Sequence, residues 1–201
     1  MIFGTFVPQG WKMELAGIAD PQEKWSTTVH IAKEAERLGY DSVWVYDHFH
    51  NVPVPAQETM FECWTTLAAI SQVTSRVRLG QMVSCALYRN PAMVAKITSS
   101  IDVISGGRLD WGIGAGWYDQ EFRAYGYEYP SNADRIRMLR ETVEIVKLMW
   151  SEGRSVPRSI CSRRRATRSN AAISRRRVFT GLRPTRSRSS SSRMSWTFES
   201  R

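Results

Sequence analysis

Cysteine, histidine and long apolar runs are scarce in this sequence of 201 residues. The three cysteines, Cys63, Cys85 and Cys161, form no C-x-x-C pair and leave an odd count, which argues against a disulfide framework or a zinc knuckle. No run approaches the ~18 consecutive apolar residues that a membrane-spanning helix needs. The first residues have neither a basic lead nor a long apolar stretch, so we expect no secretory signal, no membrane span and a cytoplasmic location.

Lysine is absent from residues 154–201, where the character of the chain changes. This segment holds 14 Arg, 12 Ser and one acidic residue, a net charge of +13, whereas residues 1–153 carry −4. The overall charge of +9 therefore gives no reason to expect nucleic-acid binding by the first part of the chain. Arginine without lysine or apolar periodicity is expected when a GC-rich gene is read in the wrong frame. We therefore expect residues 154–201 to be low-complexity, disordered and frameshifted.

Residues 1–153 alternate between short apolar runs and segments of helical periodicity. The runs are too short for helices and apolar on both parities, as is typical of strands buried on both faces of a parallel sheet. The expected strands are residues 2–7, 42–46, 77–83 and 109–113. The expected helices are residues 23–38, 59–73, 91–104 and 132–151. Strict alternation predicts parallel βαβ units with right-handed crossovers.

Four such units fit two folds equally well on pattern alone. An open doubly wound sheet can be complete with four or five strands, whereas a (β/α)8 barrel needs about 250 residues. In both folds the active face lies at the carboxyl ends of the strands, and a polar or glycine-rich segment follows each expected strand. These segments are Pro8-Gln9, Asp47-His48, Met82-Val83-Ser84 and Gly114-Ala115-Gly116. They predict a ligand site at one edge of the sheet.

Asp47-His48 is the pair best suited to chemistry, because histidine titrates near neutrality and can donate or accept a proton. A helix cap beside a structural histidine is the alternative interpretation. His48 and His50 also form the H-x-H pattern of metal hydrolases, but the third histidine, His30, lies in the first expected helix. We therefore name no metal ligands and keep a metal-dependent hydrolase as a minor alternative.

The segment Gly112-Ile113-Gly114-Ala115-Gly116 ends the fourth expected strand with little side-chain bulk. Backbone N–H groups there can form a phosphate site, although close packing at a strand end also explains the glycines. The spacing is not the G-x-G-x-x-G dinucleotide fingerprint. Trp117, Tyr118 and Tyr125 suit either stacking on a flat ring or packing in the core.

Several motifs follow one another at characteristic separations in residues 1–153. They are Phe3-Gly4-Thr5-Phe6 with Pro8-Gln9, Leu38-Gly39-Tyr40-Asp41-Ser42-Val43-Trp44 running into Asp47-His48-Phe49, Arg76-Val77-Arg78-Leu79-Gly80, Tyr88-Arg89-Asn90-Pro91-Ala92, and Asp102-Val103-Ile104-Ser105-Gly106-Gly107-Arg108-Leu109 leading to Gly112-Ile113-Gly114-Ala115-Gly116-Trp117. Together they resemble the luciferase-like flavin monooxygenases and, within them, the oxidoreductases that use the deazaflavin coenzyme F420. The resemblance implies a (β/α)8 barrel with its first four β/α units present, a deazaflavin or flavin over the carboxyl-end mouth, and hydride transfer at the central ring.

The resemblance also assigns roles to residues. His48, with Asp47, matches the catalytic position beside the reactive ring edge. Met82 and Val83 match a bulge that supports the ring, where members have a non-prolyl cis peptide, which the spacing to Asn90-Pro91 places at Gln81-Met82. Ala115 to Trp117 match the loop that approaches the phosphate-bearing side chain of the cofactor. The expected cofactor-binding residues are Gln81, Met82, Val83, Ser84, Asn90, Gly114, Ala115, Gly116 and Trp117.

The sequence departs from the family in two ways. Some deazaflavin enzymes that oxidise sugar phosphates have a catalytic glutamate where this chain has Trp117, so we do not assign that substrate. Members also continue with strands five to eight, which supply more of the cofactor site and much of the substrate pocket. Half a barrel leaves two strand edges unpaired, so we expect a truncated, marginally stable and weakly active or inactive protein.

Coenzyme F420 is the expected cofactor, with FMN as the alternative, and the expected partner is a small-molecule substrate. Family members often form homodimers, whereas the sequence itself says nothing of oligomeric state. A function of another class is polyanion or nucleic-acid binding through residues 154–201, without base preference and with steep salt dependence.

Overall fold

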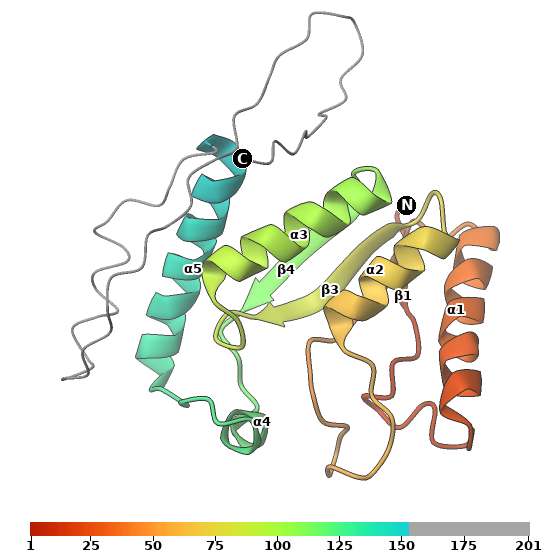
Figure 1. Cartoon of the computed structure of the whole chain (residues 1–201), viewed down its shortest axis with the longest axis horizontal. Coiled ribbons are helices and arrows are strands. Elements are labelled where there is room, and N and C mark those ends of the chain that lie inside the picture. Colours follow the sequence, from red (N-terminus) through yellow and green to blue (C-terminus); the bar gives the residue numbers. More distant parts are fainter. Residues whose placement is uncertain (153–201) are drawn as a thin grey trace, which may run out of the picture. The chain divides into compact units, whose positions relative to one another are not determined.

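The computed structural model describes residues 1–152 (Figure 1). Strands and helices alternate along the chain as predicted. The elements are β1 (Gly4–Phe6), α1 (Pro21–Arg37), β2 (Ser42–Val45), α2 (Cys63–Val73), β3 (Arg78–Cys85), α3 (Pro91–Ser105), β4 (Leu109–Gly114), α4 (Asp119–Ala124) and α5 (Asn132–Glu152). The strands form one sheet in the order β1-β2-β3-β4, and each neighbouring pair is parallel. The carboxyl ends of all four strands therefore meet at one edge.

The helices cover one face of the sheet. Figure 1 shows α2 and α3 lying across it. Val43 and its register partner Leu79 are fully buried in the core beneath these helices, together with Leu67 of α2. Trp44 and Gly80, the next register pair, lie on the opposite face, because side chains alternate along a strand. A Cβ atom on Gly80 would overlap the ring of Trp44, so this glycine makes room for the indole.

Two helices begin at residues other than those predicted. Asp20 accepts the N–H of Gln22 and Pro21 suits a first turn, so α1 begins two residues early. The start of α2 was predicted at residue 59 and lies at Cys63. There the Glu62 carboxylate accepts the N–H of Thr65, while the preceding backbone is tied to the chain after β1. Tertiary hydrogen bonding thus overrides helical periodicity at residues 59–62.

The connection between β4 and α5 contains a short helix, α4, that is not among the predicted helices. Its Phe122 is fully buried and contacts the rings of Tyr88 and Tyr129. Six residues span less than two turns, too few for an apolar period to stand out in the sequence.

Within residues 1–152, Cys63 and Cys85 are both buried and form no disulfide with each other. Cys63 packs in the core at the start of α2. Cys161 and the whole of residues 154–201, for which we predicted a frameshifted sequence, lie outside the described residues.

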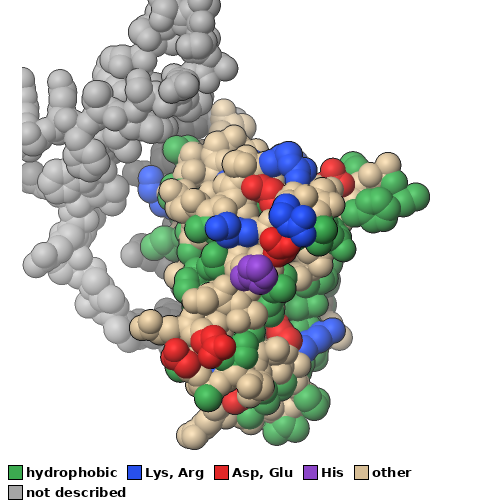
Figure 2. All heavy atoms as spheres, turned by 90° about the vertical axis from the view of Figure 1, so that its right-hand side faces the viewer, with side chains coloured by type: hydrophobic (Ala, Val, Ile, Leu, Met, Phe, Trp, Pro, Cys, Tyr) green, Lys and Arg blue, Asp and Glu red, His purple; other side chains and the backbone are tan. Residues whose placement is uncertain are grey.

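The surface on the α1 side carries acidic and basic side chains close to one another (Figure 2). That face therefore has no basic patch of the kind that binds a polyanion. Within residues 1–152, no helix is long and apolar enough to cross a membrane.

Candidate active site

Gln9 joins the ends of β1 and β2 at the carboxyl edge. Its side chain is fully buried, and its Nε2 donates to the carbonyl oxygens of Tyr46 (2.9 Å) and Phe61 (2.5 Å). Its Oε1 accepts the N–H of Tyr46 at 2.7 Å. The amide thus fixes the backbone immediately before Asp47 and His48.

His48 follows β2 and is surrounded by aromatic rings. Trp11 stacks on its imidazole, with 4.7 Å between centroids and 6° between planes. Trp117 and Tyr118 approach the same ring edge-on, at 5.7 and 6.0 Å. The Nδ1 atom lies 2.9 Å from Oε2 of Glu121, and the side chain is 13% exposed. His48 is therefore held in place while part of its ring reaches the surface.

Glu121, on α4, is a site residue that sequence reasoning missed. Its side chain is fully buried and accepts hydrogen bonds from the amides of Phe49 and His50 and from the hydroxyl of Tyr88. Burial alone would raise the pKa of this carboxyl, but the hydrogen bonds from His48, Tyr88 and the His50 amide lower it below its ordinary value. The sequence offered one signal for Glu121, which is an acidic residue directly before the large apolar residue Phe122. No helix was predicted for this segment, so no buried face could be assigned to it.

Asp47 points into a different network from its neighbour His48. Its carboxylate binds Arg89 through both oxygens, at 2.7 and 2.9 Å, and accepts the amide of Cys85 and the thiol of Cys63. The residue is 3% exposed. Arg89 also binds Glu62 at 2.8 Å, so one guanidinium joins the end of β2 to the start of α2. Asp47 therefore anchors the edge and has little capacity left for a reactant.

The thiols of this network are poor nucleophiles. Burial raises the pKa of the Cys85 thiol to about 11. Burial, with the nearby Asp47 charge, raises the pKa of the Cys63 thiol well above its ordinary value. Because the thiolate is the reactive form, both cysteines are structural near neutral pH.

The described residues contain one cluster with the spacing of metal ligands, formed by Asp47, Glu62 and Cys63. The Arg89 guanidinium contacts both of its carboxylates and thus supplies the positive charge. Neither His48 nor His50 belongs to the cluster, so the H-x-H pattern does not form a metal site with other described residues. The metal-hydrolase alternative gains no support from this geometry.

The predicted bulge lies in β3. Gln81 pairs with Trp111 and Ser84 with Ile113, so Met82 and Val83 together oppose the single residue Gly112. The non-prolyl cis peptide joins Met82 to Val83, one residue later than the predicted Gln81-Met82 bond. The extra residue of the bulge made the spacing from Asn90-Pro91 an imprecise guide.

Only two of the four predicted cofactor-binding side chains in β3 are accessible. Met82 and Val83 are 47% and 45% exposed, whereas Gln81 and Ser84 are fully buried. The Gln81 amide donates to the carbonyl oxygen of Gly112 at 3.0 Å and so ties the bulge to β4. Gln81 therefore supports the bulge, and the side chains of Gln81 and Ser84 are both closed to a ligand.

The glycines of β4 make room for the bulge. A Cβ atom on Gly112 would lie 2.9 Å from the Gln81 carbonyl oxygen, and one on Gly114 would lie 2.8 Å from Val83 Cγ2. Gly116 has a φ of +76°, and a Cβ there would lie 2.7 Å from the Cys85 sulfur. The close-packing interpretation thus accounts for all three glycines.

The remaining predicted site residues lie at the ends of β3 and β4. The Asn90 side chain accepts the N–H of Ala92 and caps α3. Ala115 is half-buried, and Trp117 is 61% exposed beside His48. Trp117 is therefore free to contact a bound molecule. The side-chain oxygen of Asn90 already accepts the N–H of Ala92.

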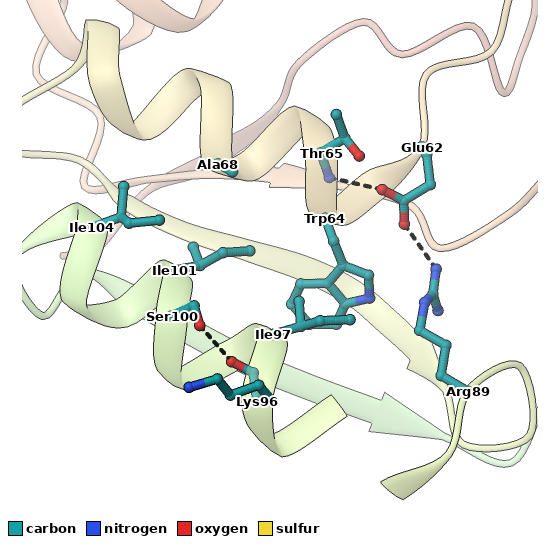
Figure 3. A pocket seen from close by; sticks show the side chains of 10 residues that line it. All are labelled: Glu62, Trp64, Thr65, Ala68, Arg89, Lys96, Ile97, Ser100, Ile101 and Ile104. Carbon is teal, nitrogen blue, oxygen red and sulfur yellow. Dashed lines mark hydrogen bonds and ion pairs between the residues drawn. The ribbon is translucent and has the colours of Figure 1, made fainter. Parts of the chain in front are cut away.

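A cavity of about 490 Å³ lies between α2 and α3 (Figure 3), and His48 is not among the residues that line it. Its walls are mostly apolar, including Trp64, Ile97 and Ile101, and Glu62 turns toward Arg89 at one end. None of the predicted site residues lines this cavity. The carboxyl edge therefore remains the candidate active site.

Comparisons with known proteins agree with this fold. The family model described as luciferase-like monooxygenase matches residues 1–180, past the predicted end of the resemblance at residue 153. The F420-dependent glucose-6-phosphate dehydrogenase of Intrasporangium calvum is 35% identical over 148 residues, which cover 72% of this chain and 42% of that protein.

Solved structures give the same picture. An F420-dependent secondary alcohol dehydrogenase bound to an F420-acetone adduct is 28% identical with a TM-score of 0.63, covering 77% of this chain and 43% of that one. A type II Baeyer-Villiger monooxygenase from Pseudomonas putida, in complex with FMN, shares the fold at 21% identity and a TM-score of 0.60, covering 75% of this chain and 39% of that one.

The chain spans about two fifths of the length of these relatives. Its parallel α/β fold matches part of their luciferase-like barrel, which confirms the predicted fold class. Because the family model covers most of the chain, this protein belongs to the luciferase-like monooxygenase family.

Proposed function

We propose that this chain is the first part of an oxidoreductase that binds coenzyme F420, or alternatively FMN, at the carboxyl edge of its sheet. The observation that carries the proposal is the position of His48, just after β2, the strand that pairs with β3, whose bulge carries two exposed apolar side chains. Relatives named as F420-dependent enzymes support the choice of cofactor.

The residues at this edge fit a flat tricyclic ring. Met82 and Val83 offer apolar surface. Gly112 and Gly114 have no side chains, so β4 can pack closely against the bulge. Trp117 is exposed beside His48 and is suited to stacking or to excluding water. When bound, the cofactor supplies the hydride acceptor or donor; the protein supplies support, orientation and proton handling.

His48 is the residue proposed to move a proton. When an alcohol is oxidised, a hydride leaves from the carbon and a proton leaves from its hydroxyl group. An imidazole at hydrogen-bond distance from the hydroxyl can take the proton. Asp47, which we expected to share this role, is proposed instead to hold the edge together through Arg89. Relatives named as dehydrogenases of glucose 6-phosphate and of a secondary alcohol favour an alcohol or carbonyl substrate. Trp117 argues against a sugar phosphate.

The rest of the cofactor site and the substrate pocket would come from strands five to eight of a complete barrel. We therefore propose that the 201-residue chain binds cofactor more weakly than a full-length relative and turns over slowly or not at all.

Fluorescence quenching on titration of the full chain with F420, and separately with FMN, tests the proposal. We expect saturable binding that is tighter for F420, and about tenfold weaker binding for His48→Ala, equivalent to ~1.4 kcal/mol. His30→Ala, a change on the exposed side of α1, is the matched control and should bind like the unmodified chain. Absence of saturable binding to either cofactor, or equal losses in both variants, would contradict the proposal.

A further inference from the structure

We infer that Glu121 is a positioning residue that holds the proton of neutral His48 on Nδ1 and leaves Nε2 as the free, proton-accepting nitrogen. The inference rests on the proposed function for what His48 acts upon. The geometry behind it is independent of any cofactor.

The hydrogen bonds around Glu121 determine the direction of its contact with His48. Oε1 accepts the amides of Phe49 and His50, both at 2.8 Å, and Oε2 accepts the Tyr88 hydroxyl at 2.6 Å. Backbone amides can only donate, and burial together with Glu121 raises the pKa of Tyr88, so its hydroxyl stays protonated.

An ionised carboxylate only accepts hydrogen bonds. At 2.9 Å from Oε2, the Nδ1 atom of His48 must therefore carry the hydrogen. In a neutral imidazole the other nitrogen is then an acceptor. Among residues 1–152, Nε2 of His48 has no hydrogen-bond partner, whereas Nδ1 has one.

The ring is fixed by a second contact. Trp11 lies parallel to the imidazole, with 6° between the planes, and restricts its tilt. Glu121 restricts its rotation by binding one particular nitrogen. Because both partners hold the ring before any ligand arrives, Nε2 points in one direction at no further cost on binding.

Glutamine at position 121 separates positioning from simple support. The side-chain oxygen of Glu121→Gln can still accept the amides of Phe49 and His50, but its NH₂ group then faces Nδ1 of His48. An NH₂ group donates, so it favours an unprotonated Nδ1 and moves the proton to Nε2. A residue that merely supported the loop would not reverse the tautomer.

Long-range ¹H–¹⁵N NMR spectra of the full, ligand-free chain labelled at histidine test the inference, at a pH where titration shows all rings to be neutral. The signals of His48 are assigned from their loss in His48→Asn. We expect the Nδ1–H tautomer in the unmodified chain and predominantly the Nε2–H tautomer in Glu121→Gln. Tyr88→Phe is the matched control: it removes another donor to Oε2 but leaves the Glu121–His48 contact, so its tautomer should not change.

An Nε2–H tautomer in the unmodified chain would overturn the inference, as would an unchanged tautomer in a folded Glu121→Gln. If Glu121→Gln does not fold, the tautomer of the unmodified chain still decides whether Nδ1 or Nε2 of His48 carries the proton, and an Nε2–H tautomer there overturns the inference. Because no cofactor is added, the outcome is independent of whether the chain binds F420 or FMN.

Discussion

Asp47 and His48 are adjacent in sequence, yet their side chains join separate charge networks. Asp47 pairs with Arg89 beside α2, and His48 pairs with Glu121 of α4. Each network contains a buried carboxylate whose oxygens are occupied by donors. Removing one partner of a buried ion pair is costly because the other is left without compensation.

Asp47→Asn should therefore lower the free energy of unfolding by about 3 kcal/mol, because Arg89 loses its bidentate partner. Urea denaturation at neutral pH measures this loss. Asp134→Asn, which breaks an exposed pair with Arg137 on α5, is the control and should cost much less than Asp47→Asn, because solvent screens exposed ion pairs. Similar losses in the two variants would show that Asp47 is not the anchor described here.

Gly112→Ala should disturb the bulge of β3, because the added methyl group would meet the Gln81 carbonyl oxygen and Val83. We expect an unfolding free energy lower by roughly 1–3 kcal/mol and F420 binding about tenfold weaker. Gly17→Ala has no atom within 4 Å of the new methyl group and serves as the control. An unchanged affinity of Gly112→Ala for F420 would show that the bulge does not contribute to cofactor binding.

At the level of elements, Glu36 ties the end of α1 to the start of β3. Its carboxylate accepts the amides of Ser75, Arg76 and Val77. Burial alone would raise the pKa of this carboxyl, but these hydrogen bonds lower it below its ordinary value. The lowered pKa means that the folded state is stabilised by the ionised form.

Glu36→Gln should lower the free energy of unfolding by about 1–2 kcal/mol at pH 7. A carboxyl whose pKa is lower in the folded state stabilises fully above its unfolded pKa of about 4.3 and loses this effect as the pH falls through the folded value. The difference between Glu36→Gln and the unmodified chain should therefore shrink below about pH 4. Denaturation series at several pH values measure it, with the exposed Glu128→Gln as control. A difference that does not vary with pH would contradict this role.

Sequence patterns predicted the elements whose apolar period is long or whose run is buried on both faces. The four strands and the helices α1, α3 and α5 follow from such patterns. The short helix α4 does not, and Glu121 was missed with it. The burial of Ser84 was equally out of reach, because the bulge at Met82 and Val83 changes the parity of β3 and no periodicity encodes that change. Gln81 precedes the bulge and shares the face of the buried Leu79, so its burial follows the ordinary alternation of a strand. His48 was predictable because a strand end alone places it.

For the whole molecule, the sheet has helices on one face, and β1 and β4 are its outer strands. Parallel sheets are ordinarily covered on both faces. On the other face, Met82 and Val83 remain nearly half exposed. The relatives are more than twice as long as their matched portions.

We propose that residues 154–201 are read out of frame. The family match runs to residue 180, past the proposed frameshift. The reading frame of residues 154–201 therefore has to be determined from the coding DNA. Resequencing codons 145–201 and translating all three frames should reveal a frame in which alternating strand and helix patterns resume. A confirmed sequence without such a frame would contradict this proposal and make the arginine-rich segment an authentic part of the chain.

The central claim is that a deazaflavin or flavin ring binds at the carboxyl edge beside His48. The most direct measurement is a ¹H–¹³C spectrum of the three histidine rings during titration with F420. We predict that the signals of His48 shift in a saturable way, because an aromatic ring bound nearby changes their shielding, while those of His30 on α1 stay in place. Binding that leaves His48 unshifted, or no saturable change at all, would contradict the account.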